Sequence, residues 1–119
     1  MVDIELKRAY EAPSGSDGFR VLVDRLWPRG LSHARLPYDL WAKDIAPSVE
    51  LRQWFHADTE HRWDEFASRY ALELQHSDAF TRFVALIASK PKVTLVYGSH
   101  DPVHNHARVI RDACQKRLG

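Results

Sequence analysis

The feature that most constrains the fold of this chain is the uninterrupted apolar run Val-Leu-Val at residues 21–23, within the segment FRVLVDR (19–25). Successive side chains of a β-strand point to opposite faces of a sheet, so this run places apolar groups on both faces. A strand of that kind needs protein cover on two sides. The run therefore predicts a central strand of a covered sheet.

The remaining elements predict an α/β domain. Three other strands are expected from alternating or continuous apolar residues, at 2–7, weakly at 38–45, and at 93–97. Helices are expected after a Ser48 cap, at 60–74 after Asp58 or Thr59, at 78–89, and at 102–117 after an Asp101 cap with Pro102 in the first position. This order favours a small, mostly parallel sheet flanked by helices, a three-layer Rossmann-like α/β fold, over residues 1–119 as one domain.

Charge and cysteine content exclude several classes of protein. The 119 residues carry a formal net charge of +1, which gives no general attraction to nucleic acid. Cys114 is the single cysteine, so no internal disulfide can form, and its place on an apolar helix face indicates a core residue. The N-terminal segment MVDIELKR carries acidic residues and lacks the apolar run of a signal peptide, and no apolar run in the chain is long enough for a bilayer. We therefore expect a cytoplasmic protein without membrane association.

Polar side chains follow two of the predicted strands, in the loops 24–30 and 97–105. Open parallel sheets bind ligands beyond the carboxyl ends of their strands, so these loops share a crevice if their strands are neighbours. The guanidinium groups of Arg25 and Arg29 match carboxylate and phosphate, and we expect Lys43, Arg52 and Tyr97 nearby. For each arginine alone, pairing with Asp24 or Asp44 is the simpler explanation. For the group, an anion pocket is favoured.

The segment SHDPVHNHA (99–107) contains three histidines but predicts no metal site. His104 and His106 are two positions apart and would point to nearly opposite sides of a helix, and His100 precedes the expected cap. We therefore predict neither a metal nor a cofactor. His104 is the candidate proton carrier, supported by Asp101 and Asn105. Asp24 is the second acid–base candidate, although neutralising an arginine and accepting loop amides is its simpler role.

Aromatic residues close the short helix that follows Ser48. Trp54, Phe55 and His56 stand at its end, and one of them is expected to line the crevice. Most buried aromatic side chains belong to the core, as expected for Trp63.

Three segments resemble the YeaO-like proteins of the larger family named domain of unknown function 488. They are DGFRVLVDRLWPRGLS (17–32), WAKDIAPSVELRQWF (41–55) and VTLVYGSHDPVHNHA (93–107), so the resemblance covers nearly the whole chain. It implies a compact α/β domain and a site, but no particular reaction. Matching positions are Asp24, Arg25, Trp27, Pro28, Arg29, Gly30, Lys43, Asp44, Pro47, Ser48, Leu51, Arg52, Trp54, Phe55, Tyr97, Asp101, His104, Asn105 and Ala107. His100 and His106 lie outside this pattern, and the cysteines that longer relatives carry near the last strand are missing here.

These observations predict a protein that binds a small anionic ligand, a phosphate ester or a nucleotide, at the carboxyl ends of its strands. Arg25, Arg29, Lys43 and Arg52 would hold the anion, with Asp24 and Asp44 orienting them. If the site is catalytic, hydrolysis or group transfer without a metal fits best. Two alternatives stay open: a nucleic-acid-associated protein whose arginines contact phosphates, and a regulatory or interaction domain without catalysis.

Overall fold

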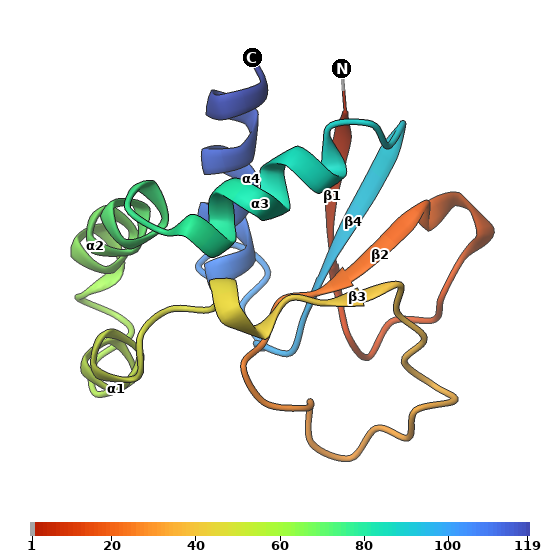
Figure 1. Cartoon of the computed structure of the whole chain (residues 1–119). Helices are drawn as coiled ribbons and strands as arrows, with labels where there is room; N and C mark the ends of the chain where they lie inside the picture. The colour runs from red at the N-terminus through yellow and green to blue at the C-terminus, as the bar shows by residue number, and fades with distance from the viewer. Residues whose placement is uncertain (1) are drawn as a thin grey trace.

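The computed structural model describes residues 2–119 and shows a four-stranded parallel sheet with four α-helices (Figure 1). The strands are β1 (Asp3–Arg8), β2 (Phe19–Leu22), β3 (Leu40–Trp41) and β4 (Lys92–Tyr97); the helices are α1 (Val49–His56), α2 (Trp63–Gln75), α3 (Asp78–Ile87) and α4 (His106–Leu118). Two short 3₁₀ helices, η1 (Gly15–Asp17) and η2 (Lys43–Ile45), lie in the connections. The predicted α/β class with a parallel sheet is confirmed.

The sheet order is β1-β4-β2-β3, which places β2 between two other strands. Val21 and Leu22 are both 0% exposed although they face opposite sides of the sheet, as the apolar run predicts for a central strand. The third strand is shorter than the expected 38–45, because only two of its residues pair with β2 before the chain turns into η2.

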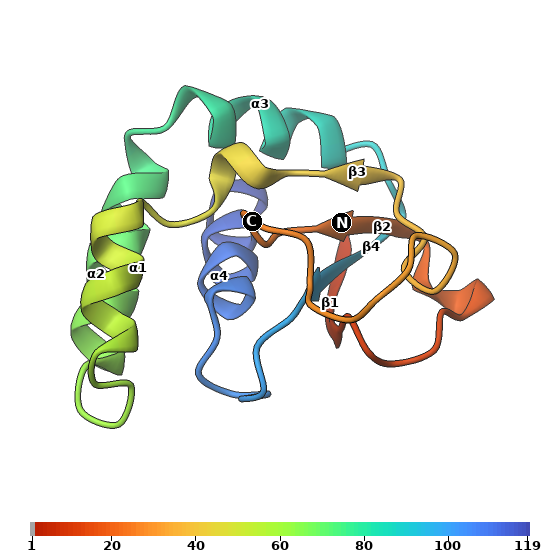
Figure 2. The same ribbon diagram turned by 90° about the horizontal axis from the view of Figure 1, so that it is seen from below.

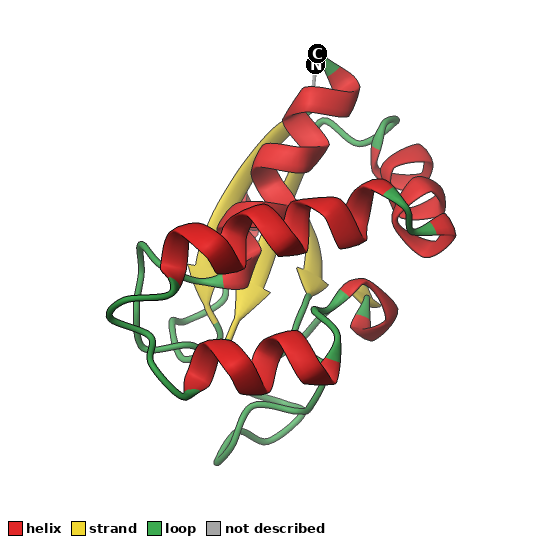
Figure 3. Cartoon of the chain, turned by 90° about the vertical axis from the view of Figure 1, so that its left-hand side faces the viewer, coloured by secondary structure: helices red, strands yellow, loops and turns green. Residues whose placement is uncertain are grey.

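The two faces of the sheet are covered differently. Figure 3 shows all four α-helices in front of the sheet, and Val21 and Leu95 belong to the large core that they cover. Leu22 and Val96 belong to a smaller core on the opposite face, together with Leu36 and Ala9 from the loops. Loops and η1 therefore form the cover of this second face, on the side of the sheet away from the helices (Figure 2).

Two helix starts are as expected, those of α1 and α3, and that of α2 is not. Ser48 caps α1, where its hydroxyl accepts a hydrogen bond from the amide of Leu51, and Ser77 caps α3 in the same way. The expected caps of α2, Asp58 and Thr59, are wrong. The helix begins only at Trp63, and the Asp58 carboxylate instead lies 2.9 Å from Nδ1 of His61. No helix within residues 2–119 is long and apolar enough to cross a membrane.

The start of α4 also differs from the prediction. Asp101 does accept hydrogen bonds from the amides of Val103 and His104, at 2.9 and 3.0 Å, but it closes a separate turn. The helix begins at His106, and its N-cap is Asn105, whose side-chain oxygen accepts from the amide of Arg108 at 3.1 Å. Two capping side chains stand four residues apart, and only the second one starts a helix.

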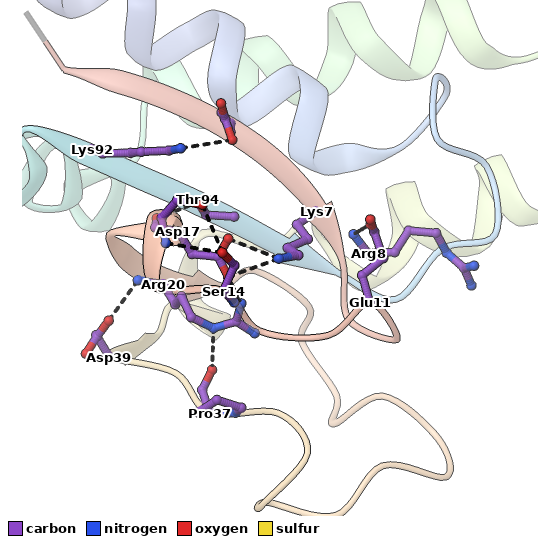
Figure 4. Close-up of polar contacts among 12 residues, drawn as sticks. Lys7, Arg8, Glu11, Ser14, Asp17, Arg20, Pro37, Asp39, Lys92 and Thr94 are labelled. Atoms are coloured by element: carbon purple, nitrogen blue, oxygen red, sulfur yellow. Dashed lines mark hydrogen bonds and ion pairs between the residues drawn. The ribbon is translucent and has the colours of Figure 1, made fainter.

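A buried carboxylate ties the loop between β1 and β2 to the sheet (Figure 4). Asp17 is 5% exposed and accepts hydrogen bonds from the Ser14 amide at 2.9 Å, Lys7 Nζ at 3.0 Å and Arg20 Nη1 at 2.5 Å. The hydroxyl of Thr94 on β4 donates to the backbone carbonyl of Asp17 at 2.6 Å. Burial raises the pKa of Asp17, but the bonds from Ser14, Lys7 and Arg20 outweigh this and leave it lowered.

We expect Asp17→Asn to lower the free energy of unfolding by about 3 kcal/mol, because Lys7 and Arg20 would keep buried charges without their counter-ion. Urea unfolding at neutral pH measures this. Asp3→Asn, which removes an exposed carboxylate from β1, is the matched control and should change stability by no more than about 0.5 kcal/mol. The stability from ionised Asp17 is present above its unfolded pKa of 3.8 and is lost below it, so the deficit should shrink in acid. An equal loss in both variants would contradict this account.

Candidate functional site

The neighbouring strands β2 and β4 bring the two polar loops together, as the shared-crevice argument requires. Asp24, two residues after β2, accepts a hydrogen bond through Oδ2 from the amide of Gly98, the first residue after β4, at 3.0 Å. The two residues are far apart in sequence but adjacent in space, because parallel neighbours end at the same edge of a sheet. A crevice at this edge therefore has walls from both loops.

A cavity of about 290 Å³, here called the central pocket, occupies this edge. Helices α1 and α2 and the start of α4 complete its walls. Its polar lining consists of Asp24, Arg25, Arg52, His56, Ser99, His100, His104, Asn105 and His106, and its other lining residues are Leu26, Ala46, Pro47, Phe55, Phe66 and Gly98. The pocket therefore has arginine and histidine side chains on one part of its wall and apolar side chains on another.

Asp24 is held by three elements. Its Oδ1 lies 3.1 Å from Nε2 of His106, and its backbone carbonyl accepts from the indole N–H of Trp41 at 2.7 Å. The same His106 nitrogen lies 3.2 Å from the carbonyl oxygen of Val23, which can only accept, so Nε2 carries the proton. Asp24 thereby fixes the loop after β2 against β4 and α4.

The two arginines of the central pocket lack carboxylate partners within residues 2–119. Arg25 donates through Nη2 to the carbonyl oxygen of Pro47 at 2.9 Å, which fixes its position without neutralising its charge. The guanidinium of Arg52, on α1, makes neither a hydrogen bond nor an ion pair with the described part of the chain. Among the described residues that line the pocket, Asp24 is the single carboxylate; its Oδ2 accepts from the Gly98 amide, while its buried Oδ1 has no hydrogen-bond partner and lies 3.1 Å from Nε2 of His106.

The pKa of His56 responds to the basic groups around it. Its pKa lies below 6.5, first because partial burial disfavours the charged form, and then because Arg52 and His106 repel a proton there. An anion in the central pocket would offset the repulsion from Arg52 and His106 and raise the pKa of His56. His56 therefore marks a place where the protein by itself is short of negative charge.

Several residues expected at the site lie elsewhere. Arg29 lines a different hollow, and the ammonium of Lys43 lies over the ring of Trp41 at 4.7 Å. Tyr97 is 3% exposed and packs in the core under the helices, since its side chain points to that face of β4. Asp101 serves the turn before α4, and Asp44 is an exposed residue of η2 that does not line the pocket.

His104 and His106 both line the pocket but make different contacts. His104 lines the rim of the pocket, where its ring stacks on Trp63 with centroids 5.0 Å apart and its Nδ1 lies 3.7 Å from Asp101. His106 is the residue in contact with Asp24. The sequence does contain the relevant signal, since a helix that begins after an Asn105 cap puts His106 in its first turn, facing the end of β2.

His56, His100 and the stacked pair Phe55–Phe66, whose ring centroids are 4.3 Å apart, also line the pocket. One of the residues 54–56 was expected there, and two of them are present. Within residues 2–119, no three histidine, cysteine or acidic side chains come close enough to hold a metal ion together. Cys114 is buried in the core, and burial raises the pKa of its thiol to about 12.

Fold and pocket together define a small parallel α/β protein with a cationic hollow at the carboxyl edge of its sheet. Residues 3–119 match the family described as "Inactive DUF488-N3 subclade", and the chain belongs to this family. It is 40% identical over 111 residues to "Uncharacterized protein YeaO" of Escherichia coli, covering 93% of this chain and 96% of the relative. It is 42% identical over 107 residues to an uncharacterized protein of Mycobacterium tuberculosis, covering 90% of this chain and 89% of the relative. No solved structure gives a significant match.

The resemblance to YeaO-like proteins is therefore confirmed over nearly the whole chain.

The contact between Gly98 and Asp24 leaves no room for a side chain. A Cβ at position 98 would lie 2.7 Å from Asp24 Oδ2, so Gly98→Ala must displace the carboxylate. We expect the free energy of unfolding to fall by about 1–3 kcal/mol, and the NMR signals of the His106 ring to shift. Gly15→Ala is the matched control, because a Cβ there meets nothing within 4 Å. Unchanged stability and unchanged His106 signals in Gly98→Ala would show that this contact is dispensable.

Proposed function

We propose that this protein binds a small organic anion, a phosphate ester or a nucleotide, in the central pocket. The observation that supports the proposal most is the charge imbalance of the lining. Two guanidinium groups line the cavity without a carboxylate partner, beside four histidines and one carboxylate, Asp24. Cations that lack internal partners favour a ligand that supplies the missing charge.

The other wall of the pocket supports an organic ligand over a bare ion. Phe55 and Phe66 present stacked rings, and Leu26 and Pro47 extend the apolar surface. A mostly apolar hollow with a few convergent polar groups is typical of small-molecule sites, and about 290 Å³ is at the small end of their range. The anionic group would lie between Arg25 and Arg52, with the organic part against the aromatic rings.

We propose binding without turnover. The family to which the chain belongs is described as an inactive subclade, which supports this choice over hydrolysis or group transfer. His104, the proton carrier expected from the sequence, is stacked on Trp63 and paired with Asp101 rather than with Asp24. Asp24 and His106 hold each other and the loop after β2, a role in positioning. We further propose that the protein acts in the cytoplasm, where a lone cysteine stays reduced.

Binding is tested by NMR titration of the ¹⁵N-labelled protein with inorganic phosphate and with AMP. We expect the amide signals of Gly98 and Ser99 to shift. Arg52→Gln should weaken both ligands about tenfold or more, the effect of losing one charge-assisted hydrogen bond. Arg82→Gln removes an exposed charge from α3, away from the pocket, and is the matched control. The absence of saturable shifts at these amides would refute the proposal. Salt-sensitive binding of an oligonucleotide alone would favour the nucleic-acid alternative.

Anion affinity should rise as the pH falls from about 7.5 to about 5.5, because a bound anion favours the protonated form of His56, whose pKa is lowered in the free protein. Sulfate is the suitable probe, since its own charge is constant over this range. His56→Asn should make the dependence shallower, while His76→Asn, on an exposed histidine at the end of α2, should not. An anion affinity that does not change with pH would contradict the placement of the anion beside His56.

A further inference from the structure

A second hollow, of about 500 Å³, adjoins the central pocket. We call it the side hollow. It is lined by Arg8, Tyr10, Arg29 and His100, at the carboxyl ends of β1 and β4. His100 lines both hollows, so one side chain forms their common border. A ligand in the central pocket that extends past His100 would enter the side hollow.

The cations of the side hollow are held in place by contacts that leave their charge available. Arg8 donates through Nε to the carbonyl oxygen of Ser99 at 2.9 Å, and its guanidinium lies 5.2 Å from the centre of the Tyr10 ring. The Tyr10 hydroxyl in turn donates to the backbone carbonyl of Arg29 at 2.8 Å. The guanidinium of Arg29 itself makes neither a hydrogen bond nor an ion pair within residues 2–119.

The nearest carboxylates do not neutralise these arginines. Glu11 accepts from the backbone amide of Arg8 at 2.7 Å, and Figure 4 shows the Arg8 guanidinium directed away from it. Asp101 accepts from the amides of Val103 and His104. Both acids therefore serve the backbone of their loops, and neither lines the side hollow.

We propose that the ligand carries at least two anionic groups and occupies both hollows. Its organic part and one anionic group would fill the central pocket, and a further phosphate would lie between Arg8 and Arg29, with His100 between the two groups. The ligand class is then an organic polyphosphate, such as a nucleoside di- or triphosphate, rather than a simple monoester. This inference rests on the proposed function, because it extends the ligand of the same site. It also accounts for Arg29, which the central pocket alone leaves without a role.

The test compares short and extended probes at constant ionic strength. Inorganic phosphate and AMP each carry one phosphate, whereas tripolyphosphate and ATP carry three. In an NMR titration all four should shift the amides of Gly98 and Ser99, and only the extended probes should also shift those of Tyr10 and Arg29. We expect ATP to bind at least about tenfold more tightly than AMP. Arg29→Gln should abolish most of this gain while leaving the AMP affinity within about twofold.

The matched control is Arg35→Gln, which removes an exposed charge from the same long loop without touching either hollow. It should retain the ATP gain, and Arg29→Gln should fold normally because the side chain makes no hydrogen bond or ion pair in the described structure. Equal affinities for short and extended probes, or an equal loss of the ATP gain in both variants, would overturn the proposal that the ligand occupies the side hollow. The proposed function would still stand. Failure of phosphate and AMP to bind would overturn the proposed function itself.

Discussion

The pairing of β2 with β4 is the constraint on which the site depends. It places the ends of two strands that are more than seventy residues apart side by side, where the Gly98 amide donates to Asp24. The glycine matters because any side chain would occupy the space of the carboxylate. Once Asp24 is fixed, His106 and Trp41 bind to the same short stretch, so the start of α4 and the edge strand β3 are positioned by it as well.

The loop-covered face and the carboxyl edge of the sheet handle charge in opposite ways. On the loop-covered face, Asp17 is buried and satisfied by Lys7 and Arg20, an arrangement that serves the fold. At the carboxyl edge, Arg25 and Arg52 stand in a hollow without a carboxylate of their own.

Much of the fold follows from local pattern, and the errors have identifiable causes. Val21 and Leu22 correctly indicate a central strand, and Ser48 correctly starts α1. The start of α4 was wrong because Asp101 and Asn105 are both good caps, and local sequence does not say which one has a helix to follow. With the helix beginning at His106, this histidine and not His104 lies against Asp24. Arg29 lines the side hollow and not the central pocket, which the sequence could not specify because the course of a loop with Pro28 and Gly30 is set by long-range packing.

By itself, the sequence determined the class of fold, the placement of most strands and helices, and the two loops that carry the polar groups. These depend on periodicity and residue type, which act over a few residues. Only the tertiary structure decided which histidine meets Asp24, which arginines share a hollow, and that Tyr97 and Lys43 face elsewhere. Those outcomes depend on strand order and on the angle at which each loop leaves its strand, and both are fixed by contacts between residues distant in the chain.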